Sequence, residues 1–92
     1  MMRYRYSTHA RRRMSERKVL RTLVRKVIQA ADHTYVDTLT GYTIYLKRLP
    51  FKGEERRIAV SVDQNKDSAT IVSVHPIRER DFVSRTNSGR WI

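Results

Sequence analysis

The sequence contains no cysteine, only two prolines and only three glycines in 92 residues. Without cysteine, disulfide bridges, thiolate zinc sites and catalytic thiols are excluded, which suits a reducing compartment. Apolar runs are also short: the longest has three residues, whereas a membrane-spanning helix needs about 20. The opening residues, MMRYRY, lack the hydrophobic stretch of a secretory signal. We therefore expect a cytoplasmic protein that does not cross a membrane.

Acidic residues are scarce as well, with nine Asp and Glu against 20 Lys and Arg and a formal net charge of +11. Apolar residues make up 39% of the chain, enough for a core, so the charge is expected on a folded surface. Such a surface attracts polyanions, which in a cytoplasm are mostly RNA and DNA. The length allows one domain. We predict a single domain over residues 1–85 and a flexible tail over residues 86–92.

The first third of the chain predicts two helices. From Leu20 to Ala31 the apolar residues recur every three or four positions, which indicates an amphipathic helix. An earlier helix, capped by Ser7 or Thr8, is expected to end near Arg17. The two would join at residues 18–19. No proline or glycine marks that joint, so one long helix is the alternative.

After residue 33 the apolar pattern changes to a period of two. It predicts four strands near residues 34–38, 42–45, 57–62 and 69–75, with short connections that favour an antiparallel meander. Residues 78–82 are expected to form a last helical turn. The expected fold class is α+β, with two N-terminal helices on one face of a four-stranded antiparallel sheet.

Candidate site residues occur first on the N-terminal helix. His9, Arg13 and Arg17 are spaced i, i+4, i+8 and would form one cationic ridge, while Arg12 points outward. Arginine binds phosphate oxygens in pairs and histidine transfers protons near neutral pH, so the ridge suits phosphoryl chemistry. The alternative is a solvated helix face. Charges on the next helix, at residues 21, 25 and 26, are interpreted as scattered and outward.

A second candidate group lies on the predicted sheet. Strand alternation predicts a common face for six side chains: Tyr45, Lys47, Arg57, Ser61, Ser73 and His75. A basic surface with aromatic rings binds unstacked RNA bases and their phosphates. Taken singly, the tyrosines are also ordinary strand residues.

No metal site is expected, because His9, His33 and His75 lack ligand spacing and the carboxylates are scattered. No cofactor motif is found either. Cleavage of a phosphodiester would then have to be metal-independent. The neighbouring 2′-OH of RNA supplies that route, and it would leave a 2′,3′-cyclic phosphate.

Residues 9–17, HARRRMSER, carry the pattern His-Ala-x-x-Arg-Met-x-Glu-Arg. Together with the strands at residues 57–62 and 71–76, this resembles an uncharacterised family of small domains, known only by a domain-of-unknown-function number, that is similar to BrnT toxins and, more distantly, to RelE-type toxins. The chain departs from that family at Lys18, where glycine is common. The resemblance implies a RelE-like fold, metal-free RNA cleavage and neutralisation by an antitoxin protein.

The sequence therefore predicts an RNA-binding, metal-independent endoribonuclease of a toxin-antitoxin-like system. The expected catalytic residues are His9, His75, Arg13 and Arg17, and the expected RNA-binding residues are Lys47, Arg57, Tyr45 and Arg12. Two alternatives stay open: a nucleic-acid-binding module without catalysis, and a basic subunit that docks an acidic protein partner.

Overall fold

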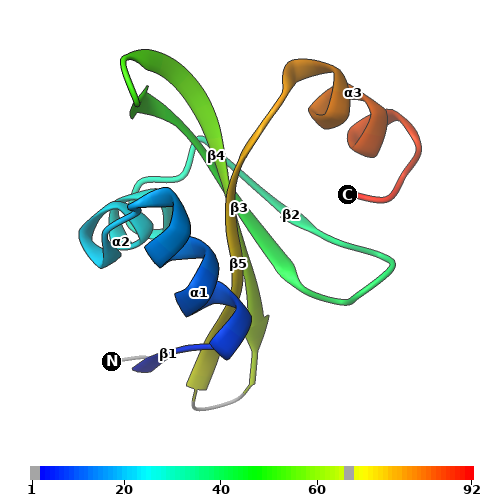
Figure 1. Cartoon of the computed structure of the whole chain (residues 1–92). Helices are drawn as coiled ribbons and strands as arrows, with labels where there is room; N and C mark the ends of the chain where they lie inside the picture. The colour runs from blue at the N-terminus through cyan, green and yellow to red at the C-terminus, as the bar shows by residue number, and fades with distance from the viewer. Residues whose placement is uncertain (1–2, 66–67) are drawn as a thin grey trace.

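The computed structural model describes residues 3–65 and 68–92, which form three helices and five strands (Figure 1). The helices are α1 (Thr8–Arg17), α2 (Arg21–Gln29) and α3 (Glu79–Asn87); the strands are β1 (Arg3–Tyr6), β2 (His33–Val36), β3 (Thr43–Phe51), β4 (Glu54–Gln64) and β5 (Ser68–Ile77). The strand order is β1-β5-β4-β3-β2. The α+β class is confirmed. The four-stranded antiparallel sheet is wrong, because β1 adds a fifth strand that runs parallel to β5.

The missed strand β1 is short and pairs with residues far away in the chain. Arg3 lies opposite Ser68, and Tyr6 lies opposite Ile71. The alternation of Arg and Tyr is a strand pattern, but it covers only four residues, and a parallel partner this distant leaves no turn signature nearby.

Both ends of helix α1 are defined by hydrogen bonds close in the chain. The Ser7 side chain accepts a hydrogen bond from the backbone N–H of Ala10 at 3.0 Å, which confirms the predicted cap. At the other end, Lys18 adopts the left-handed conformation, with φ 55°, and Val19 N–H donates to Met14 O at 2.8 Å. The chain therefore turns at Lys18, and the single long helix is excluded.

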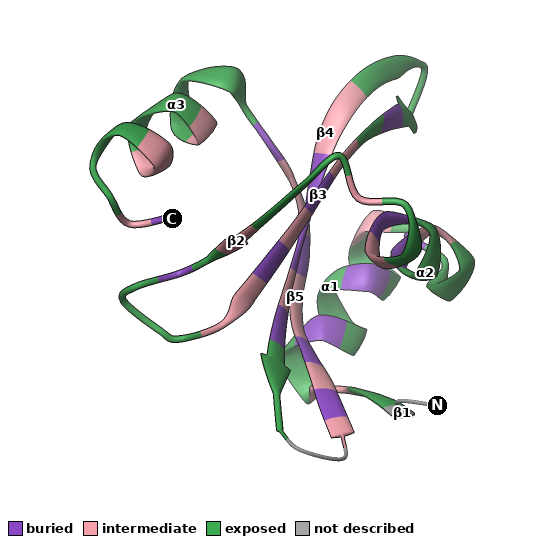
Figure 2. Cartoon of the chain, turned by 180° about the vertical axis from the view of Figure 1, so that it is seen from behind, coloured by how far each residue is buried: buried purple, intermediate pink, exposed green. Residues whose placement is uncertain are grey.

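Helices α1 and α2 cover one face of the sheet and bury its main apolar cluster. Val24 and Val27 of α2 are fully buried, and so are Val60 and Val62 of β4. Figure 2 shows buried positions concentrated on the central strands and recurring along α1. Full burial contributes roughly 1.5–3 kcal/mol for each such aliphatic side chain, so the predicted amphipathic pattern drives the docking of α2.

The opposite face is not solvated throughout, because α3 and the C-terminal residues pack on it. Trp91 is 3% exposed and joins Ile44, Leu46, Ala59 and Ile77 in a second cluster. Val36 and Ile92 exchange backbone hydrogen bonds of 3.0 and 3.1 Å. Residues 86–92 are thus a helix end and a segment paired with β2, which differs from the flexible tail that the sequence predicts.

The β3–β4 connection is tighter than the sequence indicates. Both strands continue to a two-residue turn at Lys52 and Gly53, where Phe51 pairs with Glu54. The connection predicted between the strands near residues 57–62 and 69–75 includes residues 66 and 67, which lie outside the described residues. Beside them, Asn65 N–H donates to Ser68 O at 2.8 Å. None of the helices described is long and apolar enough to span a membrane.

Candidate nucleic-acid interface

The strand register separates the predicted sheet-face residues into two groups. Tyr45 pairs with Val60 and Lys47 with Ile58, so both point to the face that α1 and α2 cover. In contrast, Arg57, Ser61, Ser73 and His75 alternate with the residues of that cluster and point to the α3 face. The predicted common face is therefore wrong. The phase expected for β3 was shifted by one residue, and such a shift moves every side chain to the other side.

Lys47 and Tyr45 both have partners within the fold. Lys47 Nζ donates to Ala30 O at 3.0 Å and lies 3.6 Å from the Asp32 carboxylate. The backbone N–H of Arg48 donates to Asp32, and this bond, with the charge of Lys47 adding to it, lowers the pKa of Asp32. The Tyr45 hydroxyl accepts from Gln64 at 3.0 Å. These side chains connect neighbouring parts of the fold.

Arg57 joins β4 to α3. Its guanidinium forms an ion pair with Glu79 and lies over the Phe82 ring, 3.9 Å from the centroid. Arg57 is only partly exposed. Pairing and stacking together hold the guanidinium in place, which indicates a structural role for Arg57.

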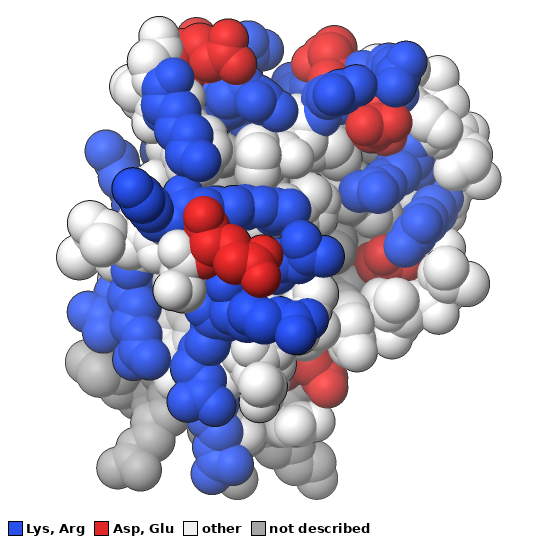
Figure 3. Space-filling model, viewed as in Figure 1, with Lys and Arg blue, Asp and Glu red and all other residues white. Residues whose placement is uncertain are grey.

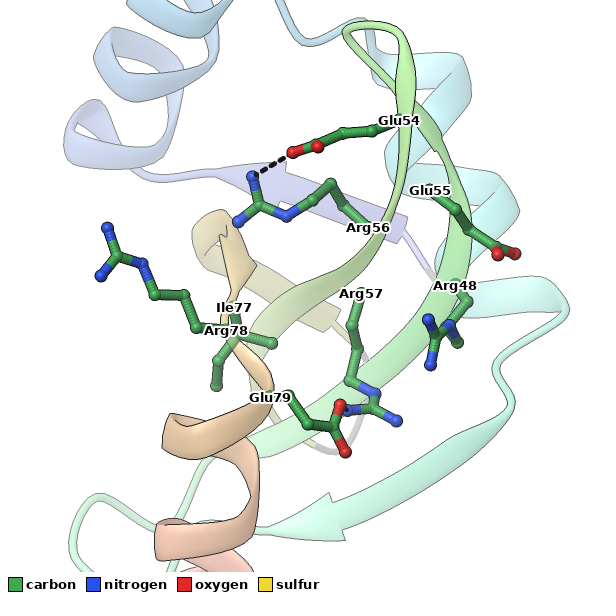
Figure 4. A pocket seen from close by; sticks show the side chains of 8 residues that line it. All are labelled: Arg48, Glu54, Glu55, Arg56, Arg57, Ile77, Arg78 and Glu79. Carbon is green, nitrogen blue, oxygen red and sulfur yellow. Dashed lines mark hydrogen bonds and ion pairs between the residues drawn. The ribbon is translucent and has the colours of Figure 1, made fainter.

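A cavity of about 480 Å³ lies beside Arg57, between the β3–β4 hairpin and the start of α3 (Figure 4). It is lined by four arginines, three glutamates and one isoleucine: Arg48, Arg56, Arg57, Arg78, Glu54, Glu55, Glu79 and Ile77. Arg56 lies 3.4 Å from Glu54, and Arg57 is paired with Glu79. The two signs of charge are mixed here, so this cavity does not concentrate anions.

The two histidines of the predicted catalytic set lie on opposite faces of the sheet. His75 pairs with Ala59 of the second cluster, on the α3 face. Burial, followed by the charges of Arg85 and Arg17, lowers the pKa of His75 to about 4. His9 is exposed in the first turn of α1, on the other face. The structure therefore does not bring them together as an acid and a base.

The predicted ridge on α1 is divided by its contacts. Arg17 is half-buried, and its Nη1 donates to Val74 O at 3.1 Å, which ties α1 to β5. Arg12 and Arg13 are exposed and lie 3.9 and 3.7 Å from Glu16. Exposed pairs of this kind are worth only about 0–1 kcal/mol, so Arg12 and Arg13 stay available to another anion.

The positive charge gathers on the outer surface of α1 and α2. Between Arg5 and Ala31 the chain has nine basic residues and one acidic residue, Glu16. Figure 3 shows the Lys and Arg side chains crowded over these helices, whereas acidic side chains interrupt them over α3. We define the arginine surface as the exposed arginines of the two helices: Arg11, Arg12, Arg13, Arg21 and Arg25.

A depression of about 320 Å³ lies between the two helices within the arginine surface. Three polar residues, Arg11, Ser15 and Arg21, line it together with three apolar ones, Met14, Val19 and Leu20. The Arg21 guanidinium is 4.5 Å from the centroid of the Tyr6 ring, so β1 helps to hold it in position. Two guanidiniums and a hydroxyl around one hollow suit a phosphate group.

Sequence reasoning missed Arg11, Arg21 and Arg25 as site residues and took the charges of α2 as scattered. The available signal was the near absence of acidic residues up to Ala31, rather than the spacing of any motif. The juxtaposition itself depends on how α1 and α2 dock side by side on the sheet.

Within residues 3–65 and 68–92, no group of three or more His, Asp or Glu side chains that could hold a metal ion is found. Comparisons with protein-family models, with curated proteins and with solved structures give no match for this chain.

Proposed function

We propose that this chain binds RNA through the arginine surface of α1 and α2. The observation that carries the proposal is the depression lined by Arg11 and Arg21, set in a surface where Glu16 is the one acidic residue among the exposed charges of the two helices. Arginine pairs with phosphate oxygens in a bidentate way, and clustered cations release counterions when a phosphate backbone binds. RNA, rather than DNA, is the polyanion that the predicted likeness to RelE- and BrnT-type domains implies. The assignment of this α+β chain to a RelE- or BrnT-like fold is part of the same proposal.

The arginine surface favours binding that is independent of base sequence. Sequence-specific recognition of RNA commonly stacks splayed bases on aromatic rings, whereas α1 and α2 contain no Phe, Tyr or Trp. Contacts to the phosphate backbone position a protein on nucleic acid without reading its sequence. We therefore expect similar affinities for RNAs of different sequence.

The test is fluorescence anisotropy of a labelled single-stranded RNA titrated with the protein over a range of NaCl concentrations. The Arg11→Gln/Arg25→Gln variant should bind about 10-fold more weakly near ~100 mM salt, and its log-log salt slope should be shallower by about 1.4, because two phosphate contacts are lost. The same measurement with single-stranded DNA and with duplex RNA shows which polyanion is preferred.

The matched control is Arg78→Gln/Arg80→Gln, which removes two exposed arginines near the start of α3. Net charge falls equally in the two double variants. The control should stay within about two-fold of the wild type, because its arginines alternate with Glu79 and Asp81. Equal losses in both variants would show that overall charge, rather than the arginine surface, attracts the RNA.

Metal-independent RNA cleavage stays a prediction, and the positions of the two histidines support His9 over His75 as its proton-transfer residue. His9 and Arg13 share one side of α1, while His75 lies across the sheet and is neutral near pH 7. The same RNA, recovered after incubation in EDTA, would carry 2′,3′-cyclic phosphate ends if the chain cuts. Cleavage should then disappear in His9→Ala and persist in His75→Gln. If the RNA stays intact at saturating protein, the cleavage prediction fails and only the binding function remains.

A further inference from the structure

A second groove lies between α2 and the β3–β4 hairpin and adjoins the depression between the helices, with Leu20 lining both. Its volume is about 660 Å³. Five lining residues are apolar, and we call them the floor: Leu20, Leu23, Leu49, Pro50 and Phe51. Three further lining residues are lysines: Lys18, Lys26 and Lys52. Thr22 completes the lining, which includes no acidic residue. We call this the lysine groove.

Two of the three lysines occupy backbone positions that do not favour lysine. Lys18 and Lys52 have φ of 55° and 52°, and they are the two non-glycine residues with positive φ in the described part of the chain. A side chain with a Cβ is disfavoured in this region relative to glycine or asparagine. Lys18 ends α1, where glycine is usual, and Lys52 precedes Gly53 in a two-residue hairpin turn, where asparagine or glycine is usual.

Leu20 is a third residue that its local structure does not favour. It stands at the N-cap of α2, where Ser, Thr, Asp or Asn would accept a backbone hydrogen bond, and it makes no such bond. Its side chain is 70% exposed. A large apolar side chain in this place therefore neither caps the helix nor fills the core.

All three unfavourable choices line the same groove. Departures from local preference tend to cluster at functional sites, because another requirement outweighs the local cost. The shared feature is that two lysines and one exposed leucine line a common hollow. Lys52 Nζ lies 5.4 Å from the centroid of the Phe51 ring, so one ammonium group is held beside the apolar floor.

We propose that the lysine groove binds an acidic amphipathic segment of a protein partner. Leucine- or phenylalanine-like side chains of that segment would cover the floor, and its Asp and Glu side chains would face Lys18, Lys26 and Lys52. The charge complementarity is direct: among residues 3–65 and 68–92, none of the three lysines forms an ion pair with an acidic residue of the chain itself.

The chemistry of the floor favours a peptide over RNA. Bases bind by stacking on rings and by hydrogen bonds at their edges. The floor offers one ring and four aliphatic residues, and Thr22 supplies the single uncharged polar side chain of the lining. The arginine surface, by comparison, has the planar groups that suit phosphates.

The test uses the intact chain as bait for a random peptide display library, followed by fluorescence polarisation of the enriched peptides. The enriched peptides should combine Asp or Glu with Leu, Ile or Phe. Lys18→Gly/Lys52→Asn should bind them about 10-fold more weakly, taking about three-fold for each exposed charge. Leu20→Asp should weaken binding by at least about 30-fold, because it removes an apolar contact and places a carboxylate against the acidic peptide.

These variants remain informative because each one suits its backbone position better than the native residue does. Glycine at position 18, asparagine at position 52 and aspartate at position 20 should leave the melting temperature unchanged or raised. The matched control, Arg78→Gln/Arg80→Gln, removes two charges outside the groove and should bind the peptides like the wild type. Arg11→Gln/Arg25→Gln should also keep peptide binding, whichever way the RNA proposal is decided.

Three results would overturn the proposal. One is a library that yields no binder, or only basic or uncharged binders. Another is an acidic peptide whose affinity is unchanged in Leu20→Asp. The third is loss of RNA affinity in Lys18→Gly/Lys52→Asn without any peptide binding, which would make the groove part of the RNA site, since these two lysines line the groove and not the depression.

Discussion

His75 illustrates how the placement of one side chain changes its chemistry. It lies on the α3 face of β5, where burial is the main cause that lowers its pKa to about 4, with the charges of Arg85 and Arg17 adding to the effect. A neutral imidazole in that position cannot act as a general acid near neutral pH. The lowered pKa of His75 should instead be measurable in how the free energy of unfolding depends on pH.

Because the pKa of His75 is lower in the folded chain than the ordinary value of 6.5, the unfolded chain takes up the proton first as the pH falls. The free energy of unfolding should therefore be unaffected by His75 above about pH 7 and should decrease between about pH 6.5 and pH 4. Between pH 7 and pH 4.5 the loss should be about 2 kcal/mol. Urea denaturation at the two pH values measures it.

The variant His75→Gln cannot be protonated in this range, so its stability should change less with pH than that of the wild type. The control is His9→Gln, which alters an exposed histidine in the first turn of α1. It should keep the pH dependence of the wild type. Equal pH dependence in both variants would contradict the placement of His75.

Among the elements, the C-terminal segment has the role that sequence reasoning most underestimated. Val36 exchanges backbone hydrogen bonds with Ile92, and the N–H of Thr38 donates to Arg90 O, so the segment covers the free edge of β2. Trp91 stacks on Tyr35, with ring centroids 6.0 Å apart. Covering an edge strand protects it from pairing with other chains.

Replacing Trp91 with alanine should lower the free energy of unfolding by about 3 kcal/mol, because a large buried side chain leaves a cavity in the second cluster. Ile92→Ala is the control, since Ile92 is 69% exposed, and it should change stability by less than about 0.5 kcal/mol. Chemical denaturation of both variants measures the difference. A stability loss in Trp91→Ala no larger than in the control would mean that the segment does not hold α3 and β2 together.

Asp37 also holds the C-terminal segment in place. Its carboxylate accepts from Arg90 at 3.3 Å and from the backbone N–H of Leu39 at 2.9 Å. Burial acts to raise the pKa of Asp37, but these hydrogen bonds and the charge of Arg90 outweigh it, so the pKa is lowered. The turn after β2 is thereby joined to the C-terminal segment.

For the whole molecule, the net charge of +11 is unevenly distributed, and most of the surplus lies on one layer. Like charges on α1 and α2 repel one another in the folded chain. Raising NaCl from about 20 mM to about 300 mM shortens the Debye length from about 20 Å to about 6 Å. The melting temperature should therefore rise by a few degrees, as followed by circular dichroism.

The rise with salt should be smaller in Arg11→Gln/Arg25→Gln than in Arg78→Gln/Arg80→Gln, because α3 has Glu79 and Asp81 between its arginines. A melting temperature that does not change with salt, or equal responses in both variants, would show that the charge on the two helices is not a source of strain.

The local patterns of the sequence were sufficient for several elements. The spacing of apolar residues in α2, the Ser7 cap of α1 and the alternation of Ile58, Val60 and Val62 each involve residues close in the chain. Their signals therefore do not depend on what the element packs against. The scarcity of acidic residues likewise showed a basic surface before its shape was known.

The tertiary structure alone decided how those elements face one another. Parallel pairing of β1 with β5, burial of Trp91 and the side to which Lys47 points all depend on partners distant in sequence. A strand's side-chain pattern repeats every two residues, so its phase is settled only by the register with its neighbours. For the same reason the sequence determined that this protein has a large positive charge, while the docking of α1 beside α2 decided that five of its arginines form one surface and that three of its lysines line an adjoining groove.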